Sequence, residues 1–69
     1  MTDIKLFITK HANDKMMWLG INKGQVKRAV VFGSKFRQYD GYLARYSSIC
    51  VAYKKIGQNR YLVKTVFNI

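Results

Sequence analysis

The period of the hydrophobic pattern changes twice along this chain, and that change constrains the fold more than any other feature. Apolar residues alternate with other residues over Ile4–Thr9, recur at helical spacing in two stretches between residues 10 and 33, and alternate again from Ser34 onward. A period of two is typical of strands, and a period near 3.6 is typical of helices. The sequence therefore predicts an α+β fold: a strand, two helices, and then an antiparallel meander of about three strands.

The first helix is predicted over Lys10–Leu19. Its apolar residues recur at helical spacing at Ala12, Met16 and Leu19. Gly20 stands where a helix commonly ends in a left-handed residue. We expect Trp18 to pack between this helix and the sheet.

A second helix is predicted to begin at Asn22, because Gln25 follows three residues later and completes a capping box. Its apolar face would consist of Val26, Ala29 and Val30, and Gly33 would close it. Both helices are short, so neither would persist without packing on the sheet.

Extended segments follow Ser34, separated by turn residues. The first is Lys35–Tyr39, and Tyr42–Tyr46 continues it. The other two are Ile49–Ile56 and Arg60–Phe67. The Asp40-Gly41 pair is a hairpin signal, and Gly57-Gln58-Asn59 is a second turn. Strict alternation in the last segment groups Tyr61, Val63, Thr65 and Phe67 on one face, and Leu62, Lys64 and Val66 on the other.

A chain of 69 residues forms one domain at most, predicted here as a single basic α+β domain over residues 1–69. The helices should cover one face of the sheet, because that is a stable two-layer arrangement. The residues expected in the core are Ile8, Met16, Leu19, Val26, Val30, Val51 and Val63. The other face would lie in solvent, and the cations expected to populate it are Lys54, Lys64, Arg45 and Arg60.

The charge balance indicates a polyanionic partner. Thirteen Lys and Arg residues stand against three aspartates and no glutamate, which gives a net charge of +10. Such a density raises the surface potential and attracts RNA or another polyanion. The alternative is that the charge only keeps an aromatic-rich domain in solution, but acidic residues would do that equally well.

Composition excludes most catalytic chemistries. Without glutamate, and with scattered aspartates, the chain cannot easily supply paired carboxylates or the ligands of a metal-dependent nuclease. One His and one Cys cannot build a zinc site, and no glycine-rich phosphate loop is present. We therefore predict no cofactor and no metal, and we expect Cys50 to be a small buried strand residue.

Localisation is predicted as cytoplasmic. The single cysteine, Cys50, cannot form an internal disulfide, which favours a reducing compartment. The first residues lack the pattern of a signal peptide, and the longest uncharged apolar stretch, Ala29–Phe32, is far too short to span a bilayer. No membrane association is expected.

Aromatic and basic residues alternate through the meander, where the tyrosines are Tyr39, Tyr42, Tyr46, Tyr53 and Tyr61. Aromatic and basic side chains on one sheet face can stack and neutralise single-stranded RNA. Tyrosine is also an ordinary strand former, so roughly half of these rings are expected in the core. The residues predicted to bind nucleic acid are Lys15, Arg37, Tyr46, Lys54 and Arg60.

His11 is the only side chain expected to titrate near neutrality. Cleavage of RNA without metal needs a base, an acid, and cations for the charge that develops on the phosphate. His11 is the leading candidate for the base or the acid. The alternative is a polar residue that bonds to backbone at a strand-to-helix junction.

Several short motifs lie along nearly the whole chain: Thr9-Lys10-His11-Ala12, Met16, Gly20-Ile21, Val26, Ile49-Cys50-Val51-Ala52-Tyr53 and Leu62-Val63-Lys64-Thr65-Val66-Phe67. Together they resemble a family of small prokaryotic proteins of unknown function, within the RelE/BrnT-like toxins of toxin–antitoxin systems. The resemblance implies the same order of strand, helices and antiparallel sheet. It also implies a ribosome-associated or free ribonuclease, held inactive by an acidic antitoxin protein.

The family's histidine falls on His11, its basic residue on Arg45, and its final-strand threonine on Thr65. Together with the chemistry of cleavage, this gives the hypothesis that His11, Arg45 and Lys64 form a metal-independent catalytic site. Two other functions remain open. One is a non-catalytic nucleic-acid-binding protein of viral or mobile-element origin, and the other is a small inhibitor that docks on an acidic host protein.

Overall fold

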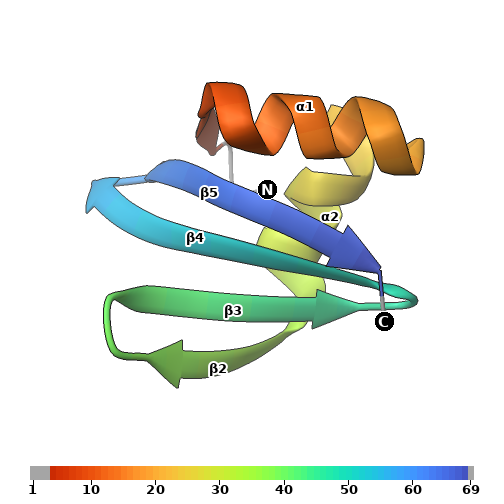
Figure 1. The fold of residues 1–69 in the computed structure, drawn as a ribbon. Coiled ribbons are helices and arrows are strands. Elements are labelled where there is room, and N and C mark those ends of the chain that lie inside the picture. The colour runs from red at the N-terminus through yellow and green to blue at the C-terminus, as the bar shows by residue number, and fades with distance from the viewer. Residues whose placement is uncertain (1–3, 69) are drawn as a thin grey trace.

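The computed structural model describes residues 4–68 and shows two helices packed on one face of a five-stranded mixed sheet (Figure 1). In chain order the elements are β1 (Lys5–Ile8), α1 (Lys10–Leu19), α2 (Lys23–Phe32), β2 (Ser34–Gln38), β3 (Gly41–Tyr46), β4 (Ile49–Gly57) and β5 (Arg60–Asn68). The predicted α+β fold and its order of elements are confirmed. Neither described helix is long and apolar enough to cross a membrane.

The strands lie side by side in the order β1-β5-β4-β3-β2. From β2 to β5 they form an antiparallel meander, which has four strands where the sequence indicated about three. β1 is parallel to β5, with Phe7 beside Leu62. The first and last strands are therefore neighbours, and β1 and β2 form the two edges of the sheet.

Both helices begin and end where the sequence predicts. The Thr9 hydroxyl oxygen accepts the backbone N–H of Ala12 at the start of α1, and Gly20 ends that helix with a φ of 70°. This is the left-handed conformation that glycine adopts without steric strain. At the start of α2, Asn22 and Gln25 form both hydrogen bonds of the capping box, at 2.8 and 2.9 Å.

The core lies between the helices and the sheet, where α1 packs on β5 and α2 packs on β3 and β4. Five of the seven residues expected there are buried: Met16, Val26, Val30, Val51 and Val63. Ile8 and Leu19 are partly buried and pack against the core at its margin. Cys50 is also buried, as expected, but it lies outside this core, in the same row of the sheet as Arg45 and Phe67.

The last strand does not alternate strictly, and the predicted faces are wrong beyond Val63. The register of β5 against β4 shifts between Val63 and Thr65, so β5 holds one extra residue there. Such a bulge turns the residues beyond it to the opposite face. Val66 therefore joins Val63 in the core, both with 0% of their surface exposed, and Phe67 faces away from it.

Trp18 does not pack between helix and sheet, contrary to the sequence prediction, because its side chain is 88% exposed. α1 buries Ala12 and Met16, which lie about one turn apart on the helix. At about 100° per residue, Trp18 stands roughly 200° from Met16. The indole ring therefore points away from the sheet.

Candidate functional site

The sheet has a second face that neither described helix covers. Side chains paired across neighbouring strands share a face. Ala44, Val51 and Val66 pair in one row and are buried, so they mark the face under the helices. The adjacent row contains Arg45 and Phe67 and faces the other way. In Figure 1, α2 lies behind the sheet and this second face is turned to the viewer.

We call this surface the open face. Its apolar residues are Phe7, Phe36, Leu43, Cys50, Ala52, Leu62 and Phe67. Its cations are Lys5, Arg45, Lys54, Arg60 and Lys64. The rings of Phe7 and Phe36 are 40% and 51% exposed, whereas Phe67 is half-buried. The open face thus combines aromatic rings with cations that come from four strands.

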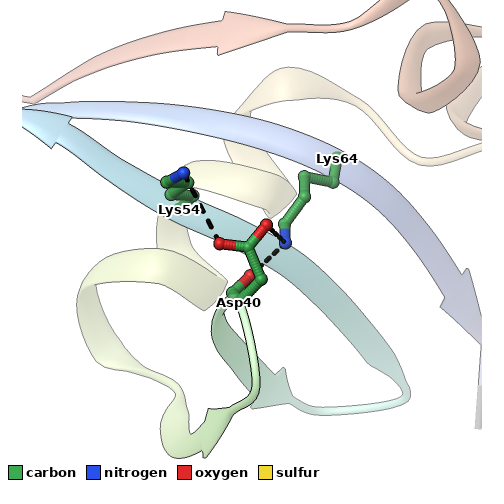
Figure 2. Close-up of polar contacts among 3 residues, drawn as sticks. All are labelled: Asp40, Lys54 and Lys64. Carbon is green, nitrogen blue, oxygen red and sulfur yellow. Dashed lines mark hydrogen bonds and ion pairs between the residues drawn. The ribbon is translucent and has the colours of Figure 1, made fainter.

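One carboxylate, that of Asp40, lies between two cations of the open face (Figure 2). Lys54 Nζ is 3.5 Å from Asp40 Oδ1, and Lys64 Nζ is 3.5 Å from Asp40 Oδ2. Lys64 Nζ also donates a hydrogen bond to the backbone carbonyl oxygen of Asp40. The positive charges of Lys54 and then Lys64 lower the pKa of Asp40 below its ordinary value. The carboxylate is therefore ionised throughout the neutral range.

The turn between β2 and β3 places Asp40 beside β4. Tyr39 and Asp40 form a two-residue loop, and Gly41 begins β3 with a φ of 115°. Side chains other than that of glycine rarely adopt this conformation. A Cβ atom at position 41 would also collide with the backbone carbonyl oxygen of Tyr53. Gly41 is thus required for the close approach of the turn to β4.

The bulge in β5 places Lys64 on the open face. Val63 and Val66 both point into the core, so the two residues between them, Lys64 and Thr65, lie on the other side. Thr9 holds this bulge from the start of α1. Its hydroxyl oxygen lies 3.0 Å from the carbonyl oxygen of Val63 and 3.2 Å from that of Lys64, to which it can donate.

The three residues predicted to be catalytic have different neighbours. Arg45 and Lys64 lie on the open face. His11 is exposed in the first turn of α1, where it lines a shallow hollow together with Lys15. Within residues 4–68, neither a hydrogen bond nor an ion pair joins His11 to Arg45 or to Lys64. A catalytic site shared by the three stays a prediction.

The five residues predicted to bind nucleic acid are spread over both sides of the sheet. Lys54 and Arg60 lie on the open face. Lys15 lies on α1. Arg37 and Tyr46 are exposed but belong to the rows of the face under the helices.

The tyrosines of the meander do not supply the rings of the open face. Tyr42, Tyr53 and Tyr61 lie on the face under the helices, with ring centroids 5.8 Å apart for Tyr42 and Tyr53 and 5.5 Å apart for Tyr53 and Tyr61. The open face carries phenylalanine rings instead, which sequence reasoning missed. For Phe7 the alternation of β1 was the available signal, because Phe7 lies between Leu6 and Ile8, which pack against the core. For Phe67 strict alternation indicated the wrong face, because the bulge in β5 precedes it.

Comparison with protein-family models, with curated proteins and with solved structures finds no match to this chain. The resemblance to the RelE/BrnT-like toxins therefore stays a prediction. In the described part of the chain, no three His, Cys, Asp or Glu side chains form a group that could hold a metal ion. The open face is the surface whose chemistry points most clearly to a ligand.

Proposed function

We propose that this protein binds single-stranded RNA on the open face of its sheet. The observation that carries the proposal is the presence of three phenylalanine rings and five cations on one uncovered sheet face. Phosphates would contact the cations and bases would stack on the rings. Stacking of a base on an aromatic side chain contributes about 1–3 kcal/mol, so two or three rings can add substantially to the electrostatic attraction.

Single-stranded RNA suits this surface better than a duplex, because exposed rings can stack only on bases that are not paired. The rings come from both edges of the sheet. Phe7 on β1 and Phe36 on β2 lie on the two edge strands and are separated by four strand spacings, which is roughly 19 Å. Each ring would therefore hold a separate base, and the strand would cross the sheet with its phosphates over the central cations.

Binding on the open face does not require His11, which lies on α1. Cleavage of the bound RNA would be a separate activity. The sequence-based hypothesis for a toxin-like ribonuclease depends on His11, whereas the open face alone accounts for binding.

The first test is the salt dependence of binding, measured by fluorescence anisotropy with a labelled single-stranded RNA. Four to six phosphate contacts would give a slope of roughly −3 to −4 for the logarithm of affinity against the logarithm of salt concentration. No binding at low salt, or an affinity that does not change with salt, would contradict the proposal.

Two matched pairs of variants test where the RNA binds. Arg45→Ala and Phe36→Ala remove a cation and a ring from the open face, whereas Arg28→Ala and Phe32→Ala remove exposed equivalents from α2. We expect Phe36→Ala to weaken binding at least about fivefold, and Arg45→Ala to reduce the salt slope by about 0.7. The α2 variants should change binding much less. If Arg28→Ala weakens binding as much as Arg45→Ala, and Phe32→Ala as much as Phe36→Ala, the open face is not the binding surface.

A further inference from the structure

Asp40 is the only acidic residue beside the cations of the open face in the described part of the chain, and its geometry is that of an anion held by two lysines. Each carboxylate oxygen faces a different ammonium group, and both distances are 3.5 Å. A phosphate also presents separate negatively charged oxygens to cationic donors. The carboxylate therefore lies where an RNA phosphate would make the same two contacts.

We propose that Lys54 and Lys64 form a phosphate-binding subsite, which the Asp40 carboxylate occupies in the free protein and leaves when an RNA phosphate binds. The inference deepens the proposed function and rests on it, since the phosphate is taken to belong to the bound RNA. The Asp40 carboxylate thus competes with RNA phosphate for Lys54 and Lys64.

The charges and exposures at this site allow the exchange. Two ammonium groups surround one carboxylate, so one positive charge is not compensated in the free protein. A phosphodiester carries the same single negative charge as the carboxylate, so replacement conserves the local balance. The side chains of Lys54, Lys64 and Asp40 are 50%, 33% and 65% exposed, which makes the subsite accessible and each ion pair weak.

A second contact holds the subsite together when the carboxylate is absent. Lys64 Nζ donates to the backbone carbonyl oxygen of Asp40, and this hydrogen bond does not depend on the side chain at position 40. Gly41 fixes the turn independently through its backbone conformation. Asp40→Asn should therefore remove the competing charge and leave the turn and both lysines in place.

The experiment compares the RNA affinity of the parent with that of Asp40→Asn and Asp14→Asn. Both variants raise the net charge by one, but Asp14 lies on α1, away from the two lysines. We expect Asp40→Asn to bind RNA about threefold to tenfold more tightly than the parent, and Asp14→Asn to gain less than about twofold. In a background that carries Lys54→Ala and Lys64→Ala, Asp40→Asn should gain no more than Asp14→Asn.

A second probe, inorganic pyrophosphate, separates this inference from the proposed function. Pyrophosphate should shift the backbone amide NMR signals of residues 40, 54 and 64, at lower concentration in Asp40→Asn than in Asp14→Asn. If RNA binds but the two variants gain equally, the subsite is wrong and RNA binding stands. If no variant binds RNA while pyrophosphate binds as expected, the subsite stands and RNA is the wrong ligand. Pyrophosphate shifts that are the same in both variants overturn the competition by Asp40.

Discussion

The hydroxyl oxygen of Thr9 lies 3.0 Å from the backbone carbonyl oxygen of Val63, which is 54 residues away along the chain. The backbone N–H of Thr9 donates to the same carbonyl oxygen at 3.2 Å. The Thr9 hydroxyl oxygen also accepts the N–H of Ala12 at 3.1 Å and so caps α1. One side chain therefore joins the first helix to the bulge from which Lys64 reaches the open face.

Replacing the Thr9 hydroxyl by a methyl group should destabilise the protein. We expect Thr9→Val to lower the free energy of unfolding by about 1–2 kcal/mol, because the cap of α1 and a hydrogen bond to β5 are both lost. Thr9→Ser keeps the hydroxyl and should stay within about 0.5 kcal/mol of the parent. Urea denaturation measures both values. Equal stabilities for the two variants would mean that the hydroxyl contributes nothing.

Two adjacent methionines provide a test of the orientation of α1. Met16 is 4% exposed and lies in the core, whereas Met17 is 75% exposed. Met16→Ala should lower the free energy of unfolding by about 2–5 kcal/mol, through lost burial and the cavity that remains. Met17→Ala should change it by less than about 0.5 kcal/mol. The reverse order in thermal or urea melts would show that the helix is rotated.

Local signals in the sequence were sufficient for the helices. The capping box depends on Asn22 and Gln25, which are three residues apart, and the end of α1 depends on Gly20, which directly follows the helix. The bulge in β5 could not be predicted in this way. It depends on the pairing of Val66 with Val51, and no residue near Val66 in the sequence indicates it. The parallel position of β1 beside β5 is likewise set by contacts between distant segments.

The candidate site was predictable in its chemistry but not in its arrangement. The cations expected on the solvent face of the sheet lie there. Alternation in β3 and β4 is sufficient to place Arg45 and Lys54 correctly. The position of Asp40 between Lys54 and Lys64 depends on the register of three strands and on the bulge, so sequence separation gave no indication of it. The exposure of Trp18 was missed because its large apolar surface favoured burial, whereas the geometry of α1 decided against it.

Alkaline pH should destabilise the protein through Tyr53. Burial, and then the neighbouring Tyr61 and Tyr42, raise the pKa of Tyr53 above its ordinary value. The unfolded chain therefore loses this proton first, as the pH passes about 10. The stabilising difference is fully present below that pH and is lost as the pH rises through the higher pKa of the folded state.

Tyr53→Phe removes the titrating hydroxyl, so its stability should fall less steeply than that of the parent between about pH 9 and pH 11. Tyr39→Phe is the control, since Tyr39 is fully exposed in the β2–β3 turn. The measurement is urea denaturation at a series of pH values. For each protein, the free energy of unfolding at each pH is compared with its value at pH 8. Parallel curves for the parent and Tyr53→Phe would contradict the assignment.

His11 separates binding from cleavage. It is exposed on α1 and has no hydrogen bond or ion pair to Arg45 or Lys64 within the described residues, so His11→Ala should bind single-stranded RNA with an affinity within about twofold of the parent. If His11 is the base or acid of a metal-free ribonuclease, the same variant should lose about 10²–10⁴-fold in the rate of RNA cleavage measured in chelator. Arg45→Ala is the complementary variant, because the loss of a cation that contacts phosphate should weaken both binding and cleavage.

Parent protein that binds RNA but leaves it intact after long incubation would end the ribonuclease hypothesis and leave binding in place. A large loss of binding in His11→Ala, with the fold unchanged by circular dichroism, would instead place the RNA across α1 and contradict its assignment to the open face.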